Sequence, residues 1–142
     1  MINRKLIRLK TVQIVYSHYL NGSSHEVKDG ESQLMQSMGA AYELYNTLLL
    51  LMVEISRLAL RQYEAQSARS QRLGQAAPSR KFVDNRFRLQ LEGNRQLAHN
   101  RQSQRIDWSN EEEFVLSLLN QITDTDFFKD YMASGKNTYD ED

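Results

Sequence analysis

Hydrophobic residues recur at intervals of three and four positions along most of the chain, which is the spacing of a helix with one apolar face. Period-two alternation rich in β-branched residues is scarce, and Pro78 is the only proline. The pattern predicts an all-α fold: a single helical domain over residues 1–142, built as a bundle of about five helices around one long central helix.

Start and stop signals place the first two helices. One begins after Asn3, a good N-cap residue, and ends before Gly22. A polar loop follows, which we expect to close at Gly30. The long central helix then covers residues 31–66, and its hydrophobic run at 48–53 should be buried on several sides because apolar side chains surround it.

Residues 67–80 are poor in hydrophobic residues and hold both a glycine and the proline, so we expect a mobile basic loop there. A shorter helix should follow, because Val83, Phe87 and Leu91 recur at four-residue spacing. This helix is expected to weaken near Gly93.

The C-terminal part begins with a helix-start signal. Ser109 and Glu112 have the S-x-x-E spacing of a capping box, and acidic residues suit the positive end of a helix dipole. The expected buried stripe of this helix is Phe114, Val115, Leu118, Leu119 and Ile122. A final short helix over 124–132 and an acidic, frayed tail over 134–142 complete the expected order.

The net charge is zero, with 18 basic and 18 acidic residues, but the charges are segregated along the chain. Residues 57–105 carry 11 basic and three acidic side chains, whereas residues 107–142 carry two basic and ten acidic ones. Such asymmetry indicates a nucleic-acid or other anionic partner, with an internally complementary surface as the alternative. Arginine outnumbers lysine 12 to 6, which favours phosphate because a guanidinium group contacts two oxygens at once.

Several function classes find no support in the sequence. Cysteine is absent, so disulfides and thiolate metal sites are impossible, and a cytoplasmic location fits best. The longest apolar run is far shorter than the roughly 20 residues that span a bilayer. His18, His25 and His99 lack a partner at helical spacing, and no phosphate-binding loop motif occurs, so we expect neither enzymatic activity nor a cofactor.

The first expected helix carries Arg4, Lys5 and Arg8 in its first two turns. Cations there oppose the helix dipole by roughly 0.3–1 kcal/mol each, so stability does not explain them. At 100° per residue, the basic positions lie on the stripe that is hydrophobic in the later turns, at Val12, Val15, Tyr16 and Tyr19.

Unpaired arginines cannot be buried without a cost of several kcal/mol, so this end should face outward. A phosphate would reverse the unfavourable electrostatics, because the helix amides and the basic side chains attract it together. RNA or DNA is the natural ligand. The alternative is that acidic residues from 107–142 pair with these cations.

The segment "RKLIRLKTVQIVYS" at 4–17 resembles the opening helix of NusB transcription antitermination factors, in which an arginine-rich start runs into an A-x-Q-x-L-Y-like signature. Val12, Gln13, Val15 and Tyr16 occupy the signature positions. Together with "LYNTLLLLMVEISRLA", "KFVDNRF" and "WSNEEEFV", in this order, the segment resembles the N-terminal region of the long NusB form of Bacteroidetes-type bacteria.

The resemblance implies a non-enzymatic helical protein that binds the boxA element of ribosomal-RNA leaders together with the ribosomal protein NusE. Such a protein helps RNA polymerase to read past terminators. Arg4, Lys5 and Arg8 would contact RNA phosphates, and Val12, Val15 and Tyr16 would anchor the helix in the core. The resemblance also implies that the chain is the N-terminal part of a longer NusB-like protein.

A second candidate surface for RNA is the basic stretch that we call the secondary basic surface, comprising Arg57, Arg61, Arg69, Arg72, Arg80, Lys81, Arg86 and Arg88. The competing hypothesis for the whole chain is a protein-interaction module without direct RNA binding. In that case the helical bundle dimerises, or docks onto the polymerase, NusE or its own C-terminal half.

Overall fold

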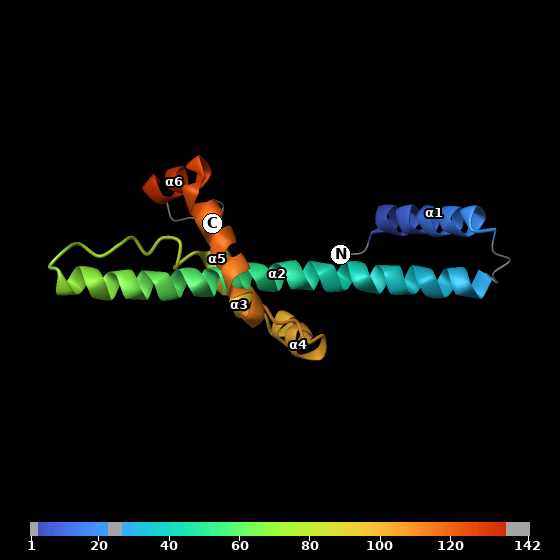
Figure 1. Ribbon diagram of the computed structural model, residues 1–142, viewed down its shortest axis with the longest axis horizontal. Helices are drawn as coiled ribbons and strands as arrows, with labels where there is room; N and C mark the ends of the chain where they lie inside the picture. The colour runs from blue at the N-terminus through green and yellow to red at the C-terminus, as the bar shows by residue number, and fades with distance from the viewer. Residues whose placement is uncertain (1–2, 23–26, 136–142) are drawn as a thin grey trace. The chain divides into compact units, whose positions relative to one another are not determined.

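The structure, a computed structural model, describes residues 3–22 and 27–135. These two ranges form six α-helices and one short 3-10 helix, η1, and contain no strand. Figure 1 shows their order. The all-α class and the long central helix are therefore confirmed. The elements are α1 Arg4–Leu20, α2 Val27–Arg72, α3 Arg86–Glu92, α4 Arg95–Ser103, η1 Ser109–Glu111, α5 Glu112–Asp124 and α6 Asp126–Ala133.

The chain divides into two compact units, Met1–Thr47 and Leu48–Asp142. Helix α2 contributes its first part to unit 1 and its second part to unit 2. The single domain expected from the sequence stays a prediction, because a helix shared by both units is compatible with one folding unit or with two.

In unit 1, α1 runs alongside the first part of α2 (Figure 1). The Asn3 side chain caps α1, since its Oδ1 accepts a hydrogen bond from the Leu6 amide at 2.9 Å. Ile7 and Ile14 are half-buried, and no residue of α1 is fully buried. The His18 ring and the Gln33 side chain form a hydrogen bond of 3.1 Å between the two helices.

Helix α2 is longer than the sequence indicated at both ends. It begins at Val27, so Gly30 lies inside the helix instead of closing a loop. At the other end residues 67–72 are still helical, because their alanine, arginine and glutamine residues are good helix formers despite low hydrophobicity. The expected basic loop over 67–80 is therefore wrong for 67–72.

The run 48–53 is buried on several sides, as expected, but not all round. Leu50 and Val53 are 7% and 5% exposed, whereas Leu48 and Met52 are 52% and 42% exposed. Leu49 and Leu51 are half-buried and pack against two different core clusters, so only the side of α2 that carries Leu48 and Met52 is open.

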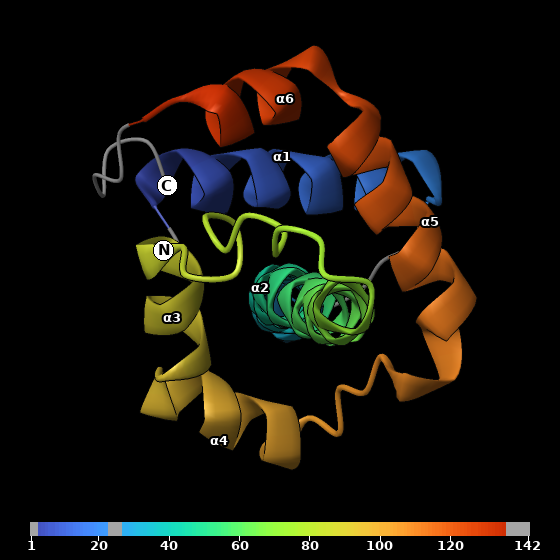
Figure 2. The ribbon, with the colours of Figure 1, turned by 90° about the vertical axis from the view of Figure 1, so that its left-hand side faces the viewer.

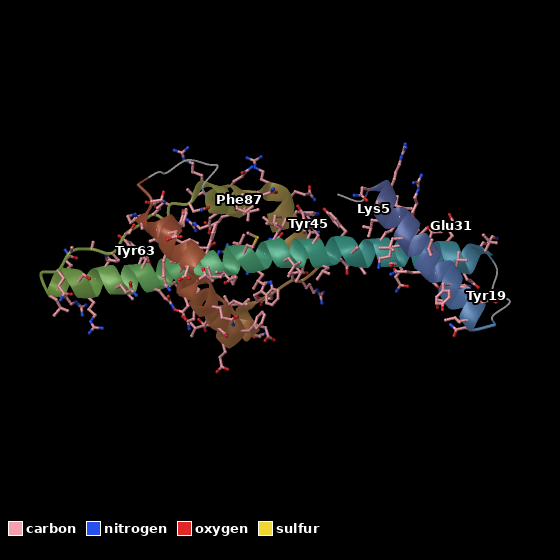
Figure 3. The ribbon with its side chains drawn as sticks, turned by 90° about the horizontal axis from the view of Figure 1, so that it is seen from above. Lys5, Tyr19, Glu31, Tyr45, Tyr63 and Phe87 are labelled. Atoms are coloured by element: carbon pink, nitrogen blue, oxygen red, sulfur yellow. The ribbon has the colours of Figure 1, made fainter. Side chains whose placement is uncertain are left out.

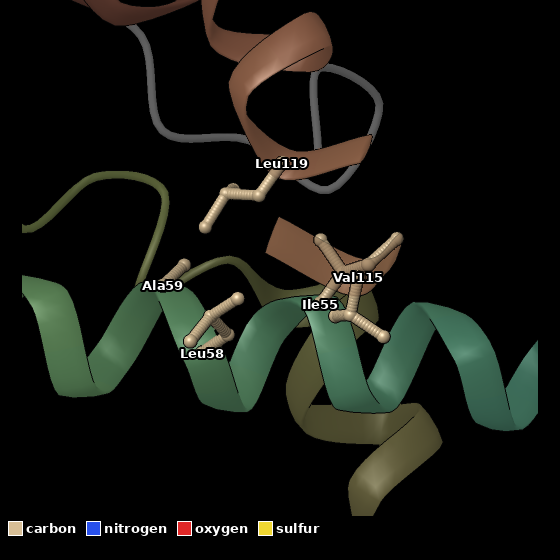
Figure 4. Close-up of a cluster of buried hydrophobic side chains, with 5 residues drawn as sticks. All are labelled: Ile55, Leu58, Ala59, Val115 and Leu119. Carbon is tan, nitrogen blue, oxygen red and sulfur yellow. The ribbon is translucent and has the colours of Figure 1, made fainter. Parts of the chain in front are cut away.

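The core of unit 2 consists of two clusters that share α2. Residues of α2 pack against α5 in the first cluster, which Figure 4 shows and which comprises Ile55, Leu58, Ala59, Val115 and Leu119. Leu97 of α4 packs against Leu50 and Val53 in the second cluster. Seen along α2, α4 and α5 accordingly lie on different sides of its second part (Figure 2).

The single helix expected from Val83 to Leu91 and beyond is two helices. Val83 is buried but precedes α3, whose N-cap is Asn85. The break falls at Gly93 as expected, and the Asn94 side chain then caps α4 by accepting from the Leu97 amide at 3.0 Å.

Helix α5 begins at Glu112, two residues after the first helical position that the capping box predicts. The preceding residue, Glu111, makes no capping hydrogen bond, and η1 supplies the turn instead. Val115 and Leu119 are buried as expected and Leu118 and Ile122 half-buried, but Phe114 is half exposed. The short helix α6 is confirmed, while the tail from 136 onward lies outside the described residues.

Candidate nucleic-acid interface

The first two turns of α1 present three cations to solvent. Arg4, Lys5 and Arg8 are all exposed, and the first turn holds no acidic residue. Within residues 3–22 and 27–135, no carboxylate lies within 4.0 Å of their side-chain nitrogens. Lys5 is near the N-terminal end of the helix, and Tyr19 is near its other end (Figure 3).

Three sources of positive potential coincide at this end of α1. The helix contains no acidic residue along its whole length, so the cations have no internal counter-charge. The dipole adds about half a positive charge, and Asn3 caps only part of the amide set that the first turn leaves unpaired. The site can therefore attract phosphate by charge and by hydrogen bonding together.

The hydrophobic residues of the later turns do not anchor α1 in a core, contrary to the role that the family resemblance implied. Val12, Val15, Tyr16 and Tyr19 are 60–81% exposed. With Leu9 they form what we call the α1 stripe. Helix α1 has two apolar faces, because Leu6, Ile7 and Ile14 are half-buried on the other side. Hydrophobic spacing alone could not tell which face is packed.

Several members of the secondary basic surface are engaged with carboxylates. Arg57 lies 3.3 Å from Glu54 and 3.4 Å from Glu92, and Arg61 lies 3.4 Å from Glu112. Arg80 is bound to Asp84 at 3.0 Å, and its hydrogen bond lowers the pKa of the Asp84 carboxyl. These pairs weaken the attraction that the stretch exerts on a phosphate chain.

Two further members are committed to the fold. Lys81 donates to the backbone carbonyls of Tyr131 and Ser134 and sits over the Tyr131 ring, 4.3 Å from its centroid. The Arg88 side chain is 10% exposed and pairs with Glu92 at 3.1 Å. By contrast, Arg69 and Arg72 in the last turn of α2 are exposed and make no ion pair within the described ranges.

Two arginines that the sequence did not single out, Arg101 and Arg105, line a groove in unit 2. They lie four residues apart at the end of α4. No motif marked them, and the signal that could have drawn attention to Arg105 is conformational: its φ is +51°, which a sequence does not display.

No protein-family model, curated protein or solved structure gives a significant match to the chain. The NusB resemblance therefore rests on the four sequence motifs. Within the described part of the chain, no helix combines the length and the hydrophobicity needed to cross a membrane. No group of three or more histidine or acidic side chains there could hold a metal ion.

Proposed function

We propose that this chain is a non-enzymatic, RNA-binding transcription antitermination and termination factor of NusB type. It contacts boxA-like leader RNA through Arg4, Lys5 and Arg8, and it acts with the ribosomal protein NusE and the transcription elongation complex. The four motifs support the family assignment, and the open cationic end of α1 supports the RNA contact.

The observation that carries the proposal is that Arg4, Lys5 and Arg8 are exposed and have no carboxylate partner among the described residues. Ion pairs with carboxylates of the same molecule would have explained these three cations as residues that stabilise the fold. Cations at this end instead cost the isolated helix roughly 0.3–1 kcal/mol each, and a bound phosphate reverses the sign of that term.

The direct test is a fluorescence anisotropy titration with a labelled boxA-like RNA. Arg4→Ala with Arg8→Ala should weaken binding by about 10-fold or more, since hydrogen bonds to charged groups contribute about 1.5–3 kcal/mol each. The matched control is Lys28→Ala with Arg95→Ala, which removes the same charge from two exposed positions outside both candidate RNA surfaces. If wild-type protein does not bind the RNA, the proposed function is wrong.

The α1 stripe favours a second candidate function, a protein-interaction module without direct RNA contact. Five large apolar side chains in a row on one exposed face are typical of a surface that another protein covers. Sedimentation of the purified chain, alone and with purified NusE, tests this. A module of this kind sediments as a dimer or as a complex with NusE, and replacing Val12 and Tyr16 by serine abolishes the association.

A further inference from the structure

The groove between α2 and α4 has an apolar floor and a basic edge. Its volume is about 640 Å³, and every lining residue belongs to unit 2. Leu50, Val53 and Leu97, which form a core cluster, contribute to the floor together with Ile106. Arg101, Gln102 and Arg105 line it from the end of α4.

The basic residues of the groove differ in how strongly they are held. Arg57 is occupied by Glu54 and Glu92, at 3.3 and 3.4 Å. Arg101 is 3.9 Å from Asp107, a long contact that leaves its donors available. Arg105 is exposed and makes no ion pair within 3–22 and 27–135. Arg105 is thus the arginine of the groove whose hydrogen-bond donors are most available to a ligand.

Arg105 occupies a position that folding alone would assign to glycine. The Ile106 amide donates to the Arg101 carbonyl at 3.2 Å, which closes α4 with a Schellman motif whose left-handed residue is Arg105, at φ +51°. Helix α2 ends in the same way, with Gln75 donating to Ser70 at 2.9 Å, and there the left-handed residue is Gly74. A side chain strains this left-handed conformation, so arginine at position 105 does not stabilise the fold. A ligand that binds in the groove explains its guanidinium group better.

The size and lining of the groove fit one unstacked nucleotide. Its volume falls within the range of about 300–1,000 Å³ that small-molecule sites use. The apolar floor suits the face of a base, the Gln102 amide can donate to and accept from a base edge, and an arginine can hold a phosphate through paired hydrogen bonds. Two carboxylates, Glu92 and Asp107, also line the groove. Both repel phosphate less than free carboxylates do, because Arg57 and Arg88 neutralise Glu92 and Arg101 lies 3.9 Å from Asp107.

We propose that this groove is a second RNA contact, which takes one nucleotide of a single strand with its base on the floor and its phosphate on Arg105. This inference rests on the proposed function, since it assigns a further site to the same ligand. An acidic peptide is the competing ligand, and segment 57–105, with 11 basic and three acidic residues, would attract either. The Gln102 amide in the lining favours the nucleotide, because it can pair with a base edge while the guanidinium group of Arg105 holds the phosphate.

The test uses a labelled oligouridine of about 12 nucleotides, a length within the site sizes of single-strand binders, and compares two single variants. Arg105→Gln should weaken binding about tenfold, because it removes charged hydrogen bonds to phosphate. Arg95→Gln removes the same charge from the other end of α4, outside the groove, and should change affinity less than about twofold. Photo-crosslinks from 4-thiouridine should map to residues 91–107.

Each other outcome overturns the inference in a distinguishable way. If wild-type protein binds RNA through Arg4 and Arg8 but Arg105→Gln behaves like Arg95→Gln, the groove assignment is wrong and the proposed function stands. If wild-type protein binds no RNA, both are wrong. If Arg105→Gln loses a glutamate- and leucine-containing peptide but keeps RNA, the groove is a peptide site. Arg105→Gly, which relieves the backbone strain, guards against a folding artefact and should lose RNA as Arg105→Gln does.

Discussion

At the scale of single residues, α2 and α4 end in the same backbone motif with different side chains at the left-handed position. Gly74 has no Cβ to clash, whereas Arg105 does. Arg105→Gly should therefore stabilise the protein by up to about 1.6 kcal/mol, because relief of about 1–2 kcal/mol of strain outweighs the 0.4–1 kcal/mol that glycine adds to the freedom of the unfolded chain. Urea denaturation measures the change.

The converse substitution provides the control for this prediction. Gly74→Arg places the same side chain at a φ of +65°, where no atom blocks a Cβ, so it adds backbone strain without a steric clash. It should destabilise by up to about 1.6 kcal/mol, because the strain of about 1–2 kcal/mol is partly offset by the 0.4–1 kcal/mol that losing glycine removes from the freedom of the unfolded chain. If neither substitution shifts the urea midpoint, the arginine side chain does not strain the backbone at position 105.

The N-cap of α1 is a second single-residue determinant. Asn3→Ala removes the acceptor for the Leu6 amide and should cost the helix about 1 kcal/mol. Hydrogen exchange of the α1 amides measures this locally, and exchange should accelerate there while the α5 amides are unaffected. Asn3→Asp keeps the acceptor, so equal acceleration in that variant would contradict a capping role.

At the scale of elements, α5 owes its place to two buried side chains. Val115 and Leu119 are each 2% exposed and pack on Ile55, Leu58 and Ala59 of α2 (Figure 4). Leu119→Ala should reduce the free energy of unfolding by about 2–5 kcal/mol, from lost burial and the cavity left behind. Leu116→Ala on the same helix, at 37% exposure, should cost less than about 1 kcal/mol, and chemical denaturation of both distinguishes packing from helix propensity.

For the outward face of α1 we expect small changes in stability, in contrast to the buried face of α5. Val12→Ser with Tyr16→Ser should change the free energy of unfolding by less than about 1 kcal/mol, because both side chains are mostly exposed already. Ile14→Ser, on the face toward α2, should cost more because Ile14 is half-buried. Equal losses in circular-dichroism melts would mean that the α1 stripe is packed within the molecule.

Element types followed from the sequence, but several boundaries and faces did not. Asn3, Gly93 and the apolar stripe of α5 are local signals, and each predicted the helix that it marks. The length of α2 was underestimated because polar residues such as those at 67–72 still favour helix, and hydrophobic periodicity does not register them. The outward face of α1 was misjudged because periodicity shows that a face is apolar and not what covers it.

At the scale of the whole chain, ion pairs within the molecule neutralise only part of the segregated charge. Arg61 of α2 and Glu112 of α5 join the basic and acidic segments at 3.4 Å, as the complementary-surface alternative expects. Other cations, among them Arg4, Arg8 and Arg105, have no such partner within the described ranges. The sequence identified Arg4 and Arg8 because cations at the N-terminal end of a helix are electrostatically unfavourable. It did not identify Arg105, because the groove that this residue lines is formed by α2 and α4, which are far apart in the sequence.

The salt dependence of RNA binding tests the central claim most directly. Each phosphate contact that is lost should lower the slope of log affinity against log salt by about 0.7 for a single strand, so Arg4→Ala with Arg8→Ala should lower it by about 1.4. Lys28→Ala with Arg95→Ala, which lie outside both candidate RNA surfaces, should leave the slope near the wild-type value. An unchanged slope in the α1 variant, or an equal drop in both pairs, would contradict α1 as the phosphate-binding end of this protein.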